Sequence, residues 1–382
     1  MNLNVCIDKN AKFIINTLNL KGYSAYAVGG CVRDVIMGKT PSDWDITTSA
    51  CPEKTQEIFA SLGIATVPTG IRHGTVSVIL ENKAYECTSF RIEEGYSDNR
   101  HPDTVIFSDR LEDDLCRRDF TVNAMAYSAD GRLVDLYGGQ ADIEKRIIRC
   151  VGNPEKRFCE DALRILRAIR FATTLNFEIE ACTLAAIIKK SSGLESVSAE
   201  RKRDELKKIL LSCNPNRGLD LIFSCKIEKY MPCTLINPTF EINRLPLCFE
   251  ARLALVTRDS IEGLKLSKKE EKRVLRFREM PDSVENEVNA RRILKKYGED
   301  AVLVCKLYQM HILAALVENE KKSNPCLELS SLAINGHDLS ALGVLPQNIG
   351  KILNSLLDEV IINPSLNSYE SLSVLALNKY AV

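Results

Sequence analysis

Two consecutive glycines near the start of this 382-residue chain stand where a backbone could bind phosphate. Gly29 and Gly30 follow the apolar stretch 25–28 and precede a predicted helix over 31–37. At such a strand-to-helix turn, residues without side chains let backbone N–H groups approach an anion. The pattern therefore predicts a phosphate-binding turn, although a Gly-Gly pair is often only a turn.

Two aspartates follow this turn with the spacing of a β-strand face. In a strand, Asp43 and Asp45 would share one face and Trp44 would take the other. Hard oxygen ligands beside a phosphate site are what Mg²⁺-dependent phosphoryl or nucleotidyl transfer requires. An Asp-x-Asp pair on a surface strand also occurs by chance, so the prediction depends on both motifs occurring together.

The two motifs in this order resemble a known catalytic signature. Gly29-Gly30-x-Val32-Arg33-Asp34 followed by Asp43-x-Asp45 is similar to the signature of the class II tRNA nucleotidyltransferase and poly(A) polymerase family. The resemblance implies that Asp43 and Asp45 are catalytic and bind Mg²⁺ as the cofactor. It also implies that Gly29, Gly30 and Arg33 contact the nucleotide.

A third carboxylate is expected on a neighbouring hairpin. Residues 75–80 and 84–90 are predicted to be its strands, joined by a turn at 81–83, and Glu86 lies on the second strand. The resemblance makes Glu86 a candidate catalytic acid, and a cross-strand partner for a lysine is the open alternative. The polar segment 90–102 that follows is expected to be a mobile loop, which in this family helps the site to switch between nucleotides.

The segment 117–126 is predicted to open a helix with Asp119 as its cap. Arginines at a helix start are unfavourable beside the helix dipole unless an anion lies there, and a nucleoside triphosphate would be that anion. The segment resembles the family motif that contacts ribose and triphosphate. The resemblance assigns nucleotide binding to Arg118, Asp119 and Asn123.

A single helix is predicted over 154–171, with one apolar stripe and with Asp161 and Arg164 on another face. Cytosine and adenine both present a ring-nitrogen acceptor beside an exocyclic amine, so an Arg donor and an Asp acceptor suit both bases and mismatch uracil and guanine. Glu160-Asp161-x-x-Arg164 resembles the base-selecting motif of the family, and Arg167 is assigned to the same nucleotide site. An exposed Asp161–Arg164 ion pair is the alternative.

The chain after residue 200 is described by helical pattern more than by motif. Residues 200–210 resemble the last signature helix of the family, which supports the base-selecting helix. Basic residues recur over 265–278 and 291–296, where helices could follow a tRNA backbone, although solvated faces are equally compatible. Residues 334–350 are predicted to form a loop and helix like those of family tails.

Composition restricts the class of protein. Lys plus Arg and Asp plus Glu both total 51, so RNA contacts need a local basic patch. The 14 cysteines include no Cys-x-x-Cys pair, and no stretch has a signal-peptide or membrane-span pattern. We therefore expect a cytoplasmic protein with reduced thiols and no membrane partner, either a monomer or a homodimer.

The expected fold is α+β. Twelve of the 19 glycines lie at or before Gly152, and the remainder of the chain has a helical pattern. The resemblance implies a nucleotidyltransferase-type (polymerase beta-like) head with a short mixed sheet, followed by an all-helical neck, body and tail. We predict the head at 1–140, the neck with its base-selecting motif at 141–208, the body at 209–270 and a tRNA-binding tail at 271–382.

The implied activity is template-independent addition of CMP and AMP, from CTP and ATP, to the 3′ end of tRNA. An enzyme that adds only A, beside a CC-adding partner, is the first alternative. A poly(A) polymerase is less compatible, because those enzymes tend to carry Gly-Arg-Arg-Phe-Arg where this chain has 69–75. A catalytically dead RNA-binding module would lose acids at the metal site, and both aspartates are present.

Overall fold

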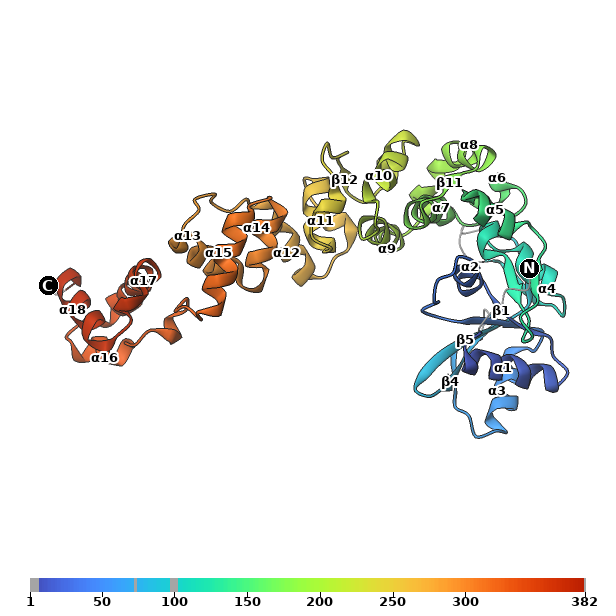
Figure 1. Cartoon of the computed structure of the whole chain (residues 1–382), viewed down its shortest axis with the longest axis horizontal. Coiled ribbons are helices and arrows are strands. Elements are labelled where there is room, and N and C mark those ends of the chain that lie inside the picture. Colours follow the sequence, from blue (N-terminus) through green and yellow to red (C-terminus); the bar gives the residue numbers. More distant parts are fainter. Residues whose placement is uncertain (1–6, 72–73, 97–101, 381–382) are drawn as a thin grey trace. The chain divides into compact units, whose positions relative to one another are not determined.

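The structure is a computed structural model that describes residues 7–71, 74–96 and 102–380 (Figure 1). The chain divides into two compact units. The first comprises Met1–Thr239 with Arg258–Lys265, and the second comprises Phe240–Thr257 with Leu266–Val382. Positions 72–73 of the segment 69–75 and the centre of the predicted loop, 97–101, lie outside the described residues. The four-part division at 140, 208 and 270 stays a prediction.

A seven-stranded sheet forms the centre of the first unit, in the order β3-β4-β5-β2-β1-β8-β9. Only the β2–β5 neighbours run parallel within the described sheet, so the short mixed sheet predicted for the head is confirmed. The strands are β1 (Ala25–Val28), β2 (Asp45–Thr48), β3 (Thr66–Gly70), β4 (Thr75–Leu80), β5 (Lys83–Ser89), β8 (Met125–Tyr127) and β9 (Leu133–Asp135).

Amphipathic helices cover this sheet. In Figure 1, α1 (Lys9–Leu20) and α3 (Pro52–Ala60) lie on one side of the sheet and α2 (Gly30–Ile36) lies on the other. Helix α1 begins where the Asp8 carboxylate accepts hydrogen bonds from two backbone N–H groups, and its apolar stripe is buried. A small apolar cluster joins the sheet to α4 (Leu111–Cys116), which precedes the Arg-Arg motif.

The predicted β4–β5 hairpin is confirmed. Its turn contains only Glu81 and Asn82, both with positive φ (+50° and +61°), which is the geometry of a two-residue hairpin turn even without glycine. The loop expected from residue 90 is partly wrong, because β6 (Arg91–Glu94) pairs with β7 (Thr104–Phe107). Glu93 stabilises β6 through ion pairs with Arg91 and with Arg117 at the end of α4. The Arg117 pair joins residues 24 positions apart, so the local sequence does not indicate it.

The helix predicted to start at Asp119 is also wrong. Residues Thr121–Asn123 form one 3₁₀ turn (η2), and the chain then enters β8. All residues from 119 to 127 are buried. Burial on every side suits a strand between β1 and β9 better than an amphipathic helix, whose outer face would meet water.

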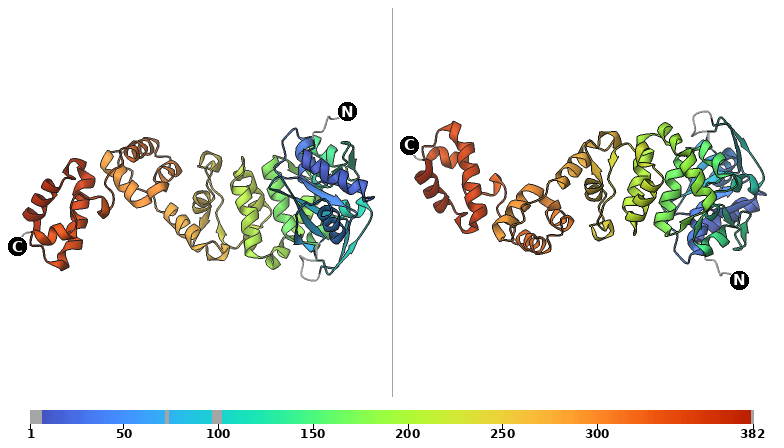
Figure 2. Two further views of the ribbon diagram at one scale, coloured as in Figure 1. Left: turned by 90° about the horizontal axis from the view of Figure 1, so that it is seen from below. Right: turned by 90° about the horizontal axis from the view of Figure 1, so that it is seen from above.

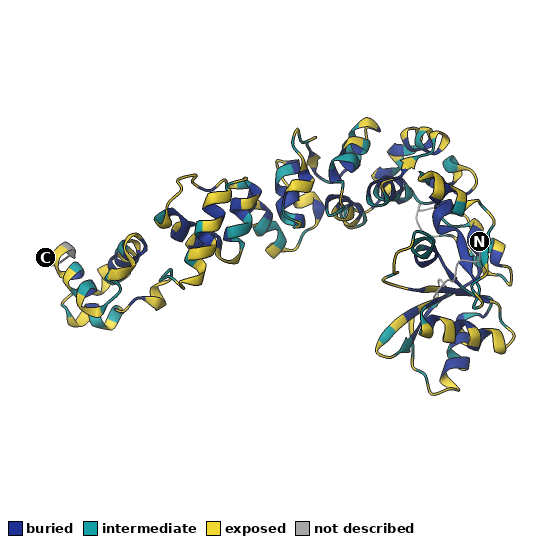
Figure 3. Ribbon diagram, in the orientation of Figure 1, coloured by how far each residue is buried: buried dark blue, intermediate teal, exposed yellow. Residues whose placement is uncertain are grey.

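The rest of the first unit is mainly helical, and Figure 3 shows buried positions where α7 and α9 face each other. Two short parallel strands, β10 (Ile147–Ile148) and β11 (Glu178–Ile179), pair beside α7, and the pair β12 (Thr234–Leu235) and β13 (Thr257–Arg258) follows later in the chain. The helices are α5 (Gly139–Lys145), α6 (Pro154–Glu160), α7 (Leu163–Leu175), α8 (Ala181–Lys190), α9 (Ala199–Leu210) and α10 (Pro215–Ser224).

The single helix predicted over 154–171 is two helices, because α6 ends at Glu160 and α7 begins at Leu163. Asp161 between them is extended (φ −146°, ψ 103°), and its Oδ1 accepts a hydrogen bond of 3.0 Å from the Leu163 N–H. Aspartate competes with helix interiors by bonding to nearby backbone N–H groups, which explains the break.

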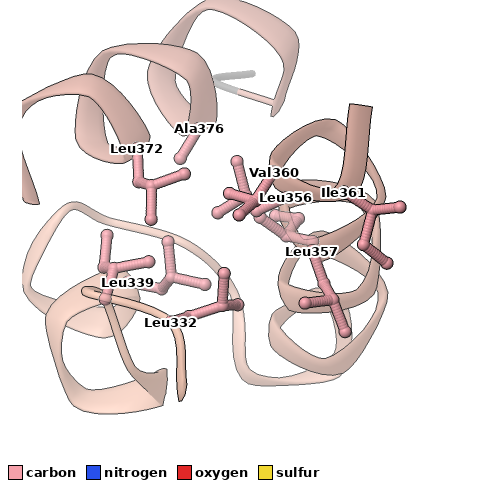
Figure 4. Close-up of a cluster of buried hydrophobic side chains, with 10 residues drawn as sticks. Leu332, Leu339, Leu356, Leu357, Val360, Ile361, Leu372 and Ala376 are labelled. Atoms are coloured by element: carbon pink, nitrogen blue, oxygen red, sulfur yellow. The ribbon is translucent and has the colours of Figure 1, made fainter. Parts of the chain in front are cut away.

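The second unit is helical, and its C-terminal part has a core of its own. Figure 4 shows this core, in which α17 packs with α18 around Leu356, Val360 and Leu372. The predicted loop and helix at 334–350 is confirmed, since Asn335 and Asp338 form a capping box that starts α16. The helices are α11 (Phe249–Val256), α12 (Lys268–Arg278), α13 (Glu287–Tyr297), α14 (Ala301–Leu307), α15 (His311–Lys322), α16 (Gly336–Ala341), α17 (Pro346–Ile362) and α18 (Tyr369–Tyr380).

Figure 2 gives two further views, in which the strands of the first unit and the helices of both units can be followed. None of the helices within the described residues is both long enough and apolar enough to cross a membrane.

Candidate active site

Strand register brings the first predicted site residues to one end of the sheet. β1 pairs with β2 so that Val28 lies opposite Asp45, and the glycine turn follows directly after Val28. β2 pairs with β5 so that Ile46 lies opposite Cys87, which places Glu86 beside the start of β2. The glycines, the aspartates and Glu86 therefore meet at one edge, although 57 positions separate Gly29 from Glu86.

The Asp-x-Asp segment keeps the predicted alternation of faces. β2 begins only at Asp45, so Asp43 precedes the strand, but Trp44 is buried and both aspartates are exposed. Although Asp45 is exposed as a whole residue, protein atoms around its carboxyl group reduce the hydration of the charged form and so raise its pKa; the charges of Glu86 and Asp43 raise this pKa further, whereas Arg118 lowers it. Negative charges thus accumulate where a cation would relieve their repulsion.

Glycine is required at position 29 for two reasons. Its φ is +83°, and an added Cβ would lie 3.1 Å from Nη1 of Arg118 and 3.9 Å from Oδ2 of Asp45. The Gly29 N–H already donates to the Met125 carbonyl oxygen at 3.3 Å. Gly29 therefore contributes space between Arg118 and Asp45 rather than a free donor.

Asp43 and Asp45 are the side chains at this site that could hold a divalent metal ion. Across residues 7–71, 74–96 and 102–380, no group of three or more His, Cys, Asp or Glu side chains is arranged to hold a metal ion. Glu86 lies close enough to influence the Asp45 carboxyl group electrostatically, and its cross-strand partner is Ser77 rather than a lysine. Two exposed carboxylates, of which that of Asp45 has a raised pKa, fit a divalent cation that prefers oxygen ligands.

A second group of predicted residues forms one hydrogen-bonded network. Arg167 donates from Nε and Nη2 to Oδ2 of Asp119, at 2.8 and 2.6 Å, and Asn123 Nδ2 donates to Oδ1 at 3.2 Å. Arg33 Nη1 donates to Oδ1 of Asn123 at 2.7 Å. Burial alone would raise the pKa of Asp119, but Arg167 outweighs it and holds this pKa at about 2.

Phe171 lies against the arginines of this network and was not among the predicted site residues. The guanidinium carbons of Arg170, Arg33 and Arg167 lie 3.8, 5.4 and 5.5 Å from the centre of its ring. Cations over an aromatic face are attracted by its quadrupole. The i, i+4 spacing of Arg167 and Phe171 on one helix could have indicated their contact from the sequence. The contact of Arg33 with the Phe171 ring depends on the fold.

The base-selecting candidates are close in sequence but are not an ion pair. Arg201 donates from Nη1 and Nη2 to Oδ1 and Oδ2 of Asp161, at 3.2 and 2.8 Å. Arg164 Nη1 instead donates to Oε2 of Glu160 at 2.6 Å, and its Nη2 donates to the Arg117 carbonyl oxygen at 3.1 Å. The alternative of an exposed Asp161–Arg164 pair is therefore wrong.

Asp161 and Arg164 each keep hydrogen-bonding groups that a ligand could use. A carboxylate offers about four acceptor sites and a guanidinium five donors. Asp161 uses three acceptor sites within the protein, and Arg164 uses three donors, including one to the Arg157 carbonyl oxygen. Each side chain retains capacity for a ligand while its position is fixed by other contacts.

Comparison with known proteins agrees with this geometry. Residues 25–149 match the family described as the poly A polymerase head domain, and residues 176–234 match the one described as a probable RNA and SrmB-binding site of polymerase A. The CCA-adding enzyme of Limosilactobacillus fermentum is 36% identical over 95% of this chain and 94% of its own length. The CCA-adding enzyme of Enterococcus faecalis is 38% identical over 92% of this chain and 90% of its own length.

Solved structures agree as well. The crystal structure of the Bacillus stearothermophilus CCA-adding enzyme in complex with CTP superposes with a TM-score of 0.86 and 30% identity, covering 97% of both chains. The fold class inferred from the motifs is thus confirmed. With the relatives matched over nearly their whole length and the catalytic motifs meeting at one edge of the sheet, this chain belongs to the family of CCA-adding enzymes.

Proposed function

We propose that this protein adds CMP and AMP, from CTP and ATP, to the 3′ end of tRNA and so builds or repairs the CCA terminus. The observation that carries the proposal is the register of β1, β2 and β5, which gathers the glycine turn, Asp43, Asp45 and Glu86 at one edge of the sheet. Membership in the CCA-adding family supports tRNA, CTP and ATP as the substrates.

In this proposal Asp43 and Asp45 hold Mg²⁺, and Glu86 is an acid beside them. The bound cation supplies charge neutralisation at the phosphates and lowers the pKa of the attacking ribose hydroxyl. Arg118 faces the triphosphate across the space left by Gly29, and Gly30 lets the triphosphate approach the start of α2. The attacking oxygen then displaces pyrophosphate from the α-phosphorus.

The network around Asp119 orients the nucleotide, and the residues between α6 and α7 select the base. Arg33, Asn123 and Arg167 provide donors beside Asp119 for ribose and phosphate oxygens. Arg164 donates to the ring nitrogen of cytosine or adenine, and Asp161 accepts from the exocyclic amine. Uracil and guanine present an N–H at that ring position, so they would leave buried polar groups unpaired.

The deciding experiment uses tRNAs that end before CCA, after C and after CC, each incubated with CTP, with ATP and with both. We expect CMP to be added to the first two substrates and AMP only to the third. Incorporation of ATP alone, and only into tRNA ending in CC, would instead identify an A-adding enzyme that needs a CC-adding partner. Long A tracts on unrelated RNA would identify a poly(A) polymerase.

A catalytically dead RNA-binding module is tested in the same assay. The matched control is Asp45→Ala, which removes one carboxylate from the proposed metal site. Wild-type protein that binds tRNA but transfers no nucleotide at any Mg²⁺ concentration would overturn the proposal. Activity in the wild type and none in the Asp45→Ala variant would support it.

A further inference from the structure

One carboxylate beside the site has no role in the reaction described so far, yet it is fully enclosed by protein. Asp114 lies in α4 with 0% of its surface exposed. Burying an ionised carboxylate is costly unless charged partners surround it. Its partners therefore indicate what this side chain does.

Asp114 binds the two consecutive arginines of the Arg117-Arg118 motif at the same time. Its Oδ1 accepts from Nε of Arg117 at 3.0 Å and also from Nη2 of that residue, and its Oδ2 accepts from Nη2 of Arg118 at 2.9 Å. Burial alone would raise the pKa of Asp114, but the charges of Arg118 and Arg117 hold it below its usual value. The carboxylate is thus a charged acceptor shared by two guanidinium groups.

Arg118 depends on this contact for its position. Its Nη1 lies over the glycine turn, 3.1 Å from where a Cβ of Gly29 would stand, and its charge acts on the Asp45 carboxyl group. Its Nε is buried without a hydrogen-bond partner. In the part of the chain that the structure describes, Asp114 is the only acceptor recorded for the Arg118 side chain.

Arg117 extends the same arrangement toward the base-selecting residues. Its Nη1 donates to Oε1 of Glu93 at 3.2 Å, so its side chain is held between two carboxylates. Its backbone carbonyl oxygen accepts from Nη2 of Arg164 at 3.1 Å. One buried carboxylate therefore lies between the arginine that faces the glycine turn and the backbone group that holds Arg164.

We propose that Asp114 is a positioning residue of the nucleotide site, which holds Arg118 at the triphosphate and, through Arg117, sets the place of Arg164. The inference rests on the proposed function, because it takes Arg118 and Arg164 as the groups that contact the nucleotide. Asp114 itself does not touch the substrate. It fixes two donors that would otherwise be free to rotate before binding.

The test replaces Asp114 with asparagine, which has nearly the same shape but only one acceptor oxygen and no charge. We expect the Kd for CTP, titrated in the presence of Mg²⁺, to rise at least tenfold in Asp114→Asn. The KM for CTP and ATP should rise in parallel, while the Kd for tRNA stays within twofold. A loss of tRNA affinity equal to the loss of CTP affinity would overturn the positioning role.

The control is Asp142→Asn in the same unit. Asp142 is also buried, at 5% exposed, and it pairs with Arg149 and with the Thr121 hydroxyl group. We expect this variant to unfold at a lower temperature and to bind CTP like the wild type. If Asp142→Asn weakens CTP binding as much as Asp114→Asn does, the effect is one of general stability and the inference fails.

A double-mutant cycle with Arg118→Ala separates this inference from the proposed function. Arg118→Ala by itself should weaken CTP binding, and an unchanged Kd would contradict the proposed nucleotide role of Arg118. Adding Asp114→Asn to Arg118→Ala should then cost clearly less than it does in the wild-type background, because one of the two arginines that Asp114 holds is gone. Fully additive losses would overturn the positioning role and leave the proposed function standing.

A second variant covers the case in which Asp114→Asn does not fold. Asp114→Glu keeps the charge and both acceptor oxygens, but it moves them by one methylene. It should weaken CTP binding several-fold in the wild-type background and clearly less in the Arg118→Ala background. Equal losses in the two backgrounds would contradict the inference.

Discussion

Arg201 in α9 binds Asp161 with both ends of its guanidinium group, at 2.8 and 3.2 Å, although the two residues are 40 positions apart. This pair fixes an aspartate that lies between two helices, where its own backbone provides no helical constraint. Three positions further on, Arg164 is held by Glu160 and by backbone carbonyl oxygens. The two base-selecting candidates are thus held by different elements.

Asp161 and Arg164 do not form an ion pair with each other, so removal of Arg164 should change which nucleotide bases the site accepts. Arg164→Ala should relax the preference for CTP and ATP over UTP and GTP by about one or two powers of ten, since a missing bidentate partner costs roughly 1–3 kcal/mol of discrimination. Binding of tRNA should persist. The measurement is misincorporation with each nucleotide supplied separately, and unchanged selectivity at the wild-type rate would place base selection elsewhere.

The raised pKa of Asp45 predicts opposite effects on activity and on stability. Its folded-state pKa lies above its unfolded value, so deprotonation of Asp45 opposes folding as the pH rises through that range. Asp45→Asn should therefore lose both CMP and AMP addition and yet unfold at a temperature equal to or above that of the wild type. Activity assays and thermal denaturation at neutral pH provide the comparison, and a large drop in Tm would contradict the prediction.

Asp119 should contribute to stability in the opposite sense. Its folded-state pKa of about 2 lies below its unfolded value of 3.8, so its contribution is present above pH 4 and is lost as the pH falls toward 2. A shift of this size corresponds to about 2 kcal/mol. Denaturant titrations between pH 2 and pH 6 should show a shallower pH dependence for Asp119→Asn than for the wild type; identical slopes would mean that Arg167 does not hold the ionised form.

In the basic segment 291–296, Arg291 has a structural role. Arg291 is 5% exposed and donates to the Ile361 carbonyl oxygen at 2.7 Å and to the Ile362 carbonyl oxygen at 3.2 Å, at the end of α17. It also pairs with Glu320. The expectation that all of these cations lie on a solvated or RNA-facing surface is therefore wrong for Arg291.

Arg291→Ala should destabilise the second unit, by about 3 kcal/mol, because it leaves the partly buried Glu320 carboxylate and two helix-end carbonyl oxygens without their donor. Arg292 is exposed, and Arg292→Ala provides the matched control. We expect Arg292→Ala to leave the unfolding midpoint unchanged and, if this helix follows tRNA phosphates, to weaken tRNA binding and reduce its salt dependence. Equal unfolding midpoints for the two variants would contradict the structural role of Arg291.

The local sequence determined the elements whose signals are local. The strands of the β4–β5 hairpin were predicted to within one residue, because strand and turn signals act over a few neighbouring residues, and the helix implied by the resemblance of residues 200–210 is α9. The chemistry of Asp43 and Asp45 was readable for the same reason, since two carboxylates and a glycine turn lie within 17 positions.

Tertiary structure decided the contacts between charged residues that are distant in the sequence. Helix periodicity alone joined residues 154–171 into one helix, and the local break at Asp161, whose carboxylate accepts from the Leu163 N–H, was missed. Arg201 reaches Asp161 only because α9 packs beside the segment between α6 and α7, whereas the contacts of Asp114 with Arg117 and Arg118 follow the local i, i+3 and i, i+4 spacing. Long charged side chains take their partners from whatever the fold brings within about 3 Å, and sequence spacing does not determine that distance.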